Sequence, residues 1–137
     1  MAYIGIYLTA LVLFLAIDAV WLSSMANRFY RAEIGVLMRD QPQWAAAAGF
    51  YVMYMLALMI LVIVPQLRAG GSLLQVFGLG TVAGAMAYGT YNMTNLAVIK
   101  QWTVAVALGD WAWGALLTGV VAALTVLIAR NIKGLMV

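Results

Sequence analysis

Charged residues divide the chain into four long apolar windows. The window from Met1 to Asn27 holds a single charge, Asp18, and the window over 101–129 holds only Asp110. The two windows between them, 41–67 and 69–99, hold none. A helix needs about 20 mostly apolar residues to cross a bilayer, so each window is long enough. The pattern predicts helices at about Ala2 to Ala26, Gln43 to Val64, Leu73 to Ala97 and Val104 to Ala129.

The composition points to the same class of protein. Of the 137 residues, 67% are hydrophobic and only 8% are charged, whereas a soluble domain carries roughly a quarter of its residues as charged side chains. We therefore expect an all-α integral membrane protein, a single domain over residues 1–137 in which four transmembrane helices form a bundle. Its first partner is the lipid bilayer.

The segments between the windows predict the connections. Pro65, followed by Gly70 and Gly71, is expected to break the second helix and form a tight turn. The segment Asn27 to Gln41 mixes Arg, Glu and Asp with aromatic and aliphatic residues, which fits a short amphipathic helix at the membrane interface or a solvated loop. The first window lacks a basic start, so a retained helix is expected there and not a cleaved secretory signal. Four spans place both termini on one side.

Polar residues of all four predicted helices gather at one depth. At the helical rise per residue, Asp18 lies about 12 Å below the end that carries the Asn27 to Gln41 segment, and Asp110 lies about 9 Å below it. The second predicted helix begins at this end with tyrosines, and the third ends at it with a run of Tyr, Thr and Asn. One half of the bundle should therefore be polar and the other apolar.

Helical spacing groups these residues further. The third predicted helix carries one stripe at spacings of three and four, made of Gly80, Gly84, Tyr88, Asn92 and Asn95. Its glycine end favours close approach of another helix. Three pairs with a spacing of three lie on the other helices: Asp18 with Trp21, Tyr51 with Tyr54, and Asp110 with Trp113. The simplest packing turns these pairs toward the stripe and encloses a polar pocket with aromatic walls.

The candidates also have structural interpretations. Asn92 and Asn95 could equally serve as hydrogen-bonding links between helices, and Trp21 and Trp102 fit an interfacial aromatic belt. A charged Asp at mid-depth costs about 3 kcal/mol or more on insertion scales, and the windows contain no Lys, Arg or His to pair with it. Each Asp must then be protonated and hydrogen-bonded, or face water. A functional role for at least one of them is the favoured interpretation, against two structural hydrogen-bonding sites.

Missing residue types limit the chemistry. The chain has no Cys and no His, so disulfides, thiolate ligands and the usual zinc ligand and neutral-pH base are absent. The net charge of +3 is spread along the chain without a basic run, which gives no support for nucleic-acid binding. We expect no metal site and no enzymatic activity, and the sequence identifies no cofactor.

Several motifs occur together along nearly the whole chain. They are FLAIDAVWL and FYRAEIG in the first part, then YGTYNMTNLA at 88–97, a tryptophan at 102 and GDWAWG at 109–114. This combination resembles the domain-of-unknown-function 2177 family of small bacterial membrane proteins. The resemblance implies a four-helix, multi-pass protein of the bacterial inner membrane with no established activity. It also implies lipid-related partners, because members are often encoded near genes for lipid modification. The family usually has Tyr-Asp-Leu-Thr-Asn where this chain has Asn92 after Tyr91, so one potential acid is lost.

Three classes of function are compatible with these residues. The favoured hypothesis is a protein that binds a small apolar or amphipathic, lipid-related molecule, or that serves as an accessory subunit of a larger membrane complex. The alternative is a proton-coupled exporter that works as a homodimer with Asp18 as the coupling site. An intramembrane enzyme acting on lipid, with Asp18 and Asp110 as acid and base, is less favoured because no activated nucleophile is visible.

Overall fold

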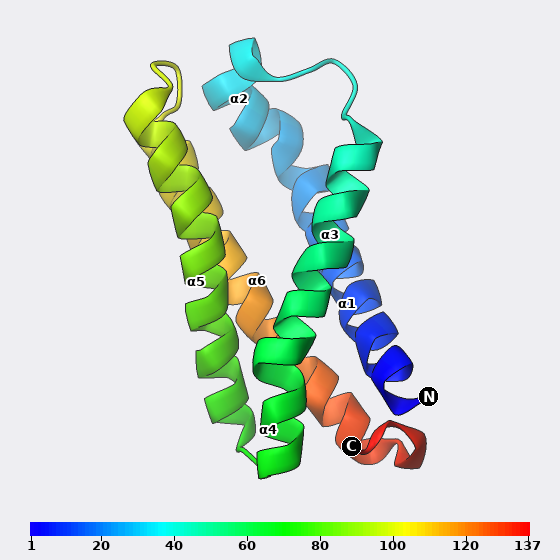
Figure 1. The fold of residues 1–137 in the computed structure, drawn as a ribbon. Helices are drawn as coiled ribbons and strands as arrows, with labels where there is room; N and C mark the ends of the chain where they lie inside the picture. The colour runs from blue at the N-terminus through cyan, green and yellow to red at the C-terminus, as the bar shows by residue number, and fades with distance from the viewer.

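Four long helices make up the fold (Figure 1). A computed structural model describes all residues 1–137, of which 87% are helical and none form strands. In chain order the elements are α1 Ala2–Met25, η1 Ala26–Tyr30, α2 Arg31–Ile34, η2 Gly35–Leu37, α3 Trp44–Leu58, η3 Met59–Ile63, α4 Val64–Ala69, α5 Leu73–Val98, α6 Val104–Asn131 and η4 Lys133–Leu135.

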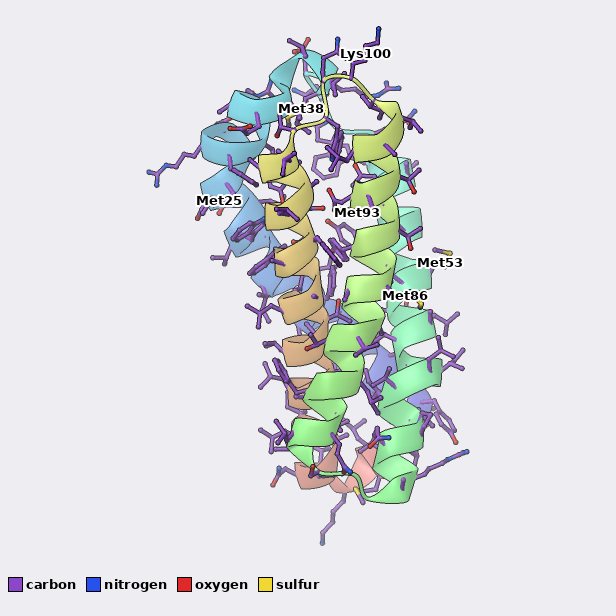
Figure 2. All side chains as sticks on the ribbon, turned by 90° about the vertical axis from the view of Figure 1, so that its left-hand side faces the viewer. Met25, Met38, Met53, Met86, Met93 and Lys100 are labelled. Atoms are coloured by element: carbon purple, nitrogen blue, oxygen red, sulfur yellow. The ribbon has the colours of Figure 1, made fainter.

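Consecutive elements join into four spans. Each is long and apolar enough to cross a membrane: Ala2–Leu37, Trp44–Ala69, Leu73–Val98 and Val104–Asn131. Both termini lie at the same end of the bundle (Figure 1), and Lys100 lies at the opposite end (Figure 2). The predicted fold class, a four-helix integral membrane bundle, is confirmed.

The first helix is longer than the sequence predicted. Its end was expected near Ala26, but the chain continues through a π-helical turn, in which the Arg31 N–H bonds to the Ala26 carbonyl, and remains helical to Leu37. The wider turn accommodates one extra residue while the chain stays helical. The segment Asn27 to Gln41 is thus mostly a continuation of α1, and only its last residues form a connection to α3.

Pro65 does not break the second span, contrary to the prediction. It lies in the first turn of α4, directly after the π-helical turn η3, where the Val64 N–H bonds to the Met59 carbonyl. A proline lacks an N–H donor and crowds the preceding turn, and the wider π turn supplies the room. The helix ends instead at Gly70, whose φ of +66° is left-handed and suits glycine.

Helices α5 and α6 approach each other closely through glycine. A Cβ on Gly80 would lie 2.9 Å from the Ala122 Cβ, and a Cβ on Gly84 would lie 2.6 Å from the carbonyl oxygen of Gly114. Both distances are too short for a real side chain. The glycine half of the predicted stripe therefore faces α6, as in small-residue packing motifs of membrane helices.

The apolar half of the bundle holds the core. On α1 the buried face repeats every four residues with Ile6, Ala10 and Phe14, and the next position on that face is Asp18. The same helix face thus packs the core and then presents a carboxylate. On the outside, Met53 of α3 and Met86 of α5 are more than half exposed and point away from the bundle (Figure 2), as expected for surfaces that contact lipid chains.

Candidate functional site

Asp18 is held by donors from two other helices. Its side chain is only 7% exposed. The Tyr51 hydroxyl of α3 donates to its Oδ2 at 2.8 Å, and the Trp113 indole N–H of α6 donates to its Oδ1 at 3.0 Å. One carboxylate therefore ties α1, α3 and α6 together.

Asp110 of α6 has a second pair of donors. The Tyr30 hydroxyl donates to its Oδ1 at 2.6 Å, and the Asn92 amide donates to its Oδ2 at 2.7 Å. Asn92 is fully buried on α5 and also donates to the Tyr88 carbonyl at 3.0 Å, while its own Oδ1 accepts no hydrogen bond. Asp110 thus joins α6 to α5 and to the π turn after α1.

Two tryptophans connect the surroundings of the carboxylates. Trp21 stacks on Trp113, with ring centroids 4.3 Å apart and planes 7° from parallel. The Trp21 indole N–H also donates to the Tyr30 hydroxyl at 3.0 Å. Since Trp113 donates to Asp18 and Tyr30 donates to Asp110, one continuous group of side chains contains both acids.

The donors to both carboxylates are neutral. They are two tyrosine hydroxyls, one indole and one carboxamide, and no Lys or Arg is among them. Hydrogen bonds of this kind spread the charge of a carboxylate but do not neutralise it. No group of three or more His, Cys, Asp or Glu side chains lies together as a metal site would require.

A cavity of about 330 Å³ opens beside this group of side chains. Residues of all four spans line it: Asp18, Leu22, Tyr30, Phe50, Tyr51, Ala87, Tyr88, Tyr91, Asp110 and Trp113. Both carboxylates therefore face one space whose walls are mostly aromatic. The Tyr88 hydroxyl, which also lines it, forms no hydrogen bond to another side chain.

The cavity has an open side between α3 and α5. The distance between these two helices increases from the turn at Gly70 toward the other end of the bundle (Figure 1). Phe50 of α3 is 39% exposed and Tyr91 of α5 is 55% exposed, although both line the cavity. The cavity is therefore accessible from outside the bundle beside these two residues.

The structure brings together most of the residues that the sequence singled out. Five of them line the cavity: Asp18, Tyr51, Tyr88, Asp110 and Trp113. Trp21 and Asn92 do not line it but bond to groups that do. Tyr54 lies deeper, where its hydroxyl and that of Thr118 are 2.8 Å apart. Asn95 lies outside the cavity, and its side-chain partner is Tyr91, four residues earlier on α5.

The hydrogen-bond partners of the first pair lie on other helices than the sequence suggested, although Asp18 lines the same cavity as the stripe residue Tyr88. Asp18 and Trp21 were expected to point at the stripe on α5, but their contacts are with Tyr51 and with Trp113. The reason is that α1 packs against α3 and α6 and makes few contacts with α5. Of the two acids, only Asp110 forms a hydrogen bond with a side chain of the stripe, that of Asn92.

Sequence reasoning missed Tyr30 as a site residue. It lies in the segment that was predicted to follow the first helix as an interfacial helix or a solvated loop, outside the predicted bundle. Its position in the FYRAEIG motif was the available signal. Phe50 and Tyr91, which line the open side, were also missed, because they lie beside the residues chosen by helical spacing.

Comparison with known proteins identifies a family. The model of the family described as "Predicted membrane protein (DUF2177)" matches residues 3–127, so the resemblance seen in the motifs is confirmed. No curated protein and no solved structure matches the chain.

Proposed function

The chain belongs to this DUF2177 family of predicted membrane proteins, and from that premise we propose that it binds a small apolar or amphipathic, lipid-related molecule in the cavity between its four spans. The observation that carries the proposal is the combination of aromatic walls with two carboxylates in one cavity. Ligand sites in proteins are mostly apolar concavities with a few polar groups that fix orientation.

The size of the cavity suits part of an amphipathic molecule. A volume of about 330 Å³ lies at the lower end of the range of small-molecule sites. A head group or ring would fill it beside Asp18 and Asp110. An attached alkyl chain would pass between Phe50 and Tyr91 into the bilayer, because those two residues border the open side.

The proposed role is recognition without covalent chemistry. The side chains beside the two acids are Tyr, Trp and Asn, which hold and orient the carboxylates, and the chain has no His or Cys to act as base or nucleophile. We further propose that the protein lies in the bacterial inner membrane, alone, as a homo-oligomer or as an accessory subunit of a larger complex.

Native mass spectrometry of protein extracted in a neutral detergent tests the proposal. A bound molecule should survive extraction from the wild type and be lost from Ala87→Phe, because Ala87 lines the cavity and a phenyl ring would fill it. Ala97→Phe is the matched control, since Ala97 is exposed on the same helix. Equal retention in both variants would contradict binding in the cavity. The same spectra give the number of subunits.

A proton-coupled exporter is the second candidate, and the burial of Asp18 beside the cavity favours it. Such a protein would move its substrate across a sealed vesicle when a pH gradient is imposed, and Asp18→Asn would abolish that flux. Binding without flux in the same proteoliposomes would support the binding protein.

A further inference from the structure

The cavity holds two acidic side chains without a positively charged partner from the protein. Asp18 and Asp110 both line it, and the four donors to their oxygens are neutral groups. Away from bulk water, a carboxylate is costly unless it is protonated or meets a cation. The bundle supplies no such cation, because no Lys or Arg lines the cavity.

The walls of the cavity also favour a positively charged ligand. The cavity that holds the two carboxylates is also lined by six aromatic side chains, those of Tyr30, Phe50, Tyr51, Tyr88, Tyr91 and Trp113. The face of an aromatic ring is the negative part of its quadrupole and attracts ammonium groups. An anionic head group would meet both carboxylates and these ring faces, and the cavity offers it no charged donor.

We propose that the ligand is an amphipathic organic cation, an ammonium group on an apolar body, and that the Asp18 and Asp110 carboxylates, which line one cavity, bind its charge. This inference rests on the proposed binding function. Each carboxylate has already two donors, so the ammonium N–H groups use the remaining oxygen lone pairs that face the cavity. The Tyr88 hydroxyl, which has no partner among the side chains, is a further acceptor.

Three probes of equal chain length separate charge from apolar contact: octylamine, octanol and octanoate. Their affinities are measured by calorimetric titration of the protein in a neutral maltoside detergent at pH 7. Octylamine should bind at least about tenfold more tightly than octanol, the ratio expected for one well-placed charge contact, and octanoate should bind most weakly. This ranking needs only the wild-type protein.

Variants assign the preference to the two acids. Asp18→Asn and Asp110→Asn should each reduce the ratio of octylamine to octanol affinity severalfold, because the amide keeps hydrogen bonding but loses the charge. The chain offers a matched control in Asp40→Asn, since Asp40 is exposed in the connection before α3. That variant should keep the wild-type ratio.

The outcomes distinguish this inference from the function on which it rests. If octylamine and octanol bind equally and both affinities fall in Ala87→Phe, the proposal that the ligand is a cation is overturned, whereas the proposal that the cavity binds a ligand stands. A preference for octanoate would also overturn the proposal that the ligand is a cation. Binding of all three probes that is unchanged by Ala87→Phe would overturn both proposals. A charge preference that persists in both Asp variants would overturn the assignment to these carboxylates.

Discussion

Trp21 of α1 lies flat against Trp113 of α6, with ring centroids 4.3 Å apart. Through this contact the two acids share one set of neighbours, because Trp113 donates to Asp18 and Trp21 donates to the tyrosine that holds Asp110. A change at either carboxylate therefore alters the packing beside the other. Asp18 and Asp110 are best regarded as parts of one site.

The first prediction concerns Tyr30, whose hydroxyl accepts from Trp21 and donates to Asp110. Tyr30→Phe removes both hydrogen bonds and should lower the free energy of unfolding by about 1–2 kcal/mol. Tyr88→Phe is the control, since the hydroxyl it removes bonds to no side chain, and its effect should stay below about 0.5 kcal/mol. Unfolding by sodium dodecyl sulfate in mixed micelles, followed by tryptophan fluorescence, measures both. Similar losses would argue against the Tyr30 bridge.

The second prediction compares the two asparagines of α5. Asn92 is fully buried and donates to Asp110, so Asn92→Ala should cost about 1–2 kcal/mol through a lost bond to a carboxylate. Asn95 is half-buried, and its side-chain partner is the exposed Tyr91 on the same helix and not Asp110, so Asn95→Ala should cost less than Asn92→Ala. The same unfolding assay applies. An equal or larger loss in Asn95→Ala would contradict the arrangement around Asp110.

The third prediction tests the contact between α5 and α6. In Gly84→Ala the new Cβ would lie 2.6 Å from the Gly114 carbonyl oxygen, so the helices must move apart, at a cost of about 1–3 kcal/mol for overpacking. Gly78 on the same helix has nothing within 4 Å of an added Cβ. Gly78→Ala should therefore be neutral or slightly stabilising in the unfolding assay. A neutral Gly84→Ala would contradict the close packing.

The fourth prediction concerns topology, which the absence of native cysteine makes easy to test. Single cysteines at Asp40 and Lys100 should react with a membrane-impermeant maleimide from one side of a sealed vesicle. A cysteine at Met136, which is exposed near the C-terminus, should react only from the other side. Labelling of all three from one side would contradict the four-span arrangement.

The spans and the polar half could be predicted from the sequence because the bilayer imposes them. An apolar window without charge has few alternatives to a helix, and depth along a helix follows from residue count alone. This reasoning placed Asp110 beside Asn92, which lies at a similar depth on a neighbouring helix.

The remaining features of the site could not be predicted, because they depend on irregular helical turns and on which helices are neighbours. A π turn at 26–30 keeps Tyr30 helical and turns its hydroxyl toward Asp110, and hydropathy does not reveal such a turn. Asp18 bonds to residues of α3 and α6 because α1 packs against those helices. The spacing of residues along α5 does not predict this packing. Spacing also placed Tyr54 in the pocket, whereas it lies one turn deeper beside Thr118.

Photo-crosslinking tests the central claim, that the cavity beside Asp18 and Asp110 is a binding site, most directly. An alkylamine with a diazirine beside its nitrogen is irradiated with the protein, and the modified residues are located by mass spectrometry. We expect labels at cavity residues of several helices, such as Phe50, Tyr88 and Trp113. Octylamine should compete for them, and they should be lost in Ala87→Phe and kept in Ala97→Phe. Labels spread over the outer surface, without competition and equal in both variants, would contradict it.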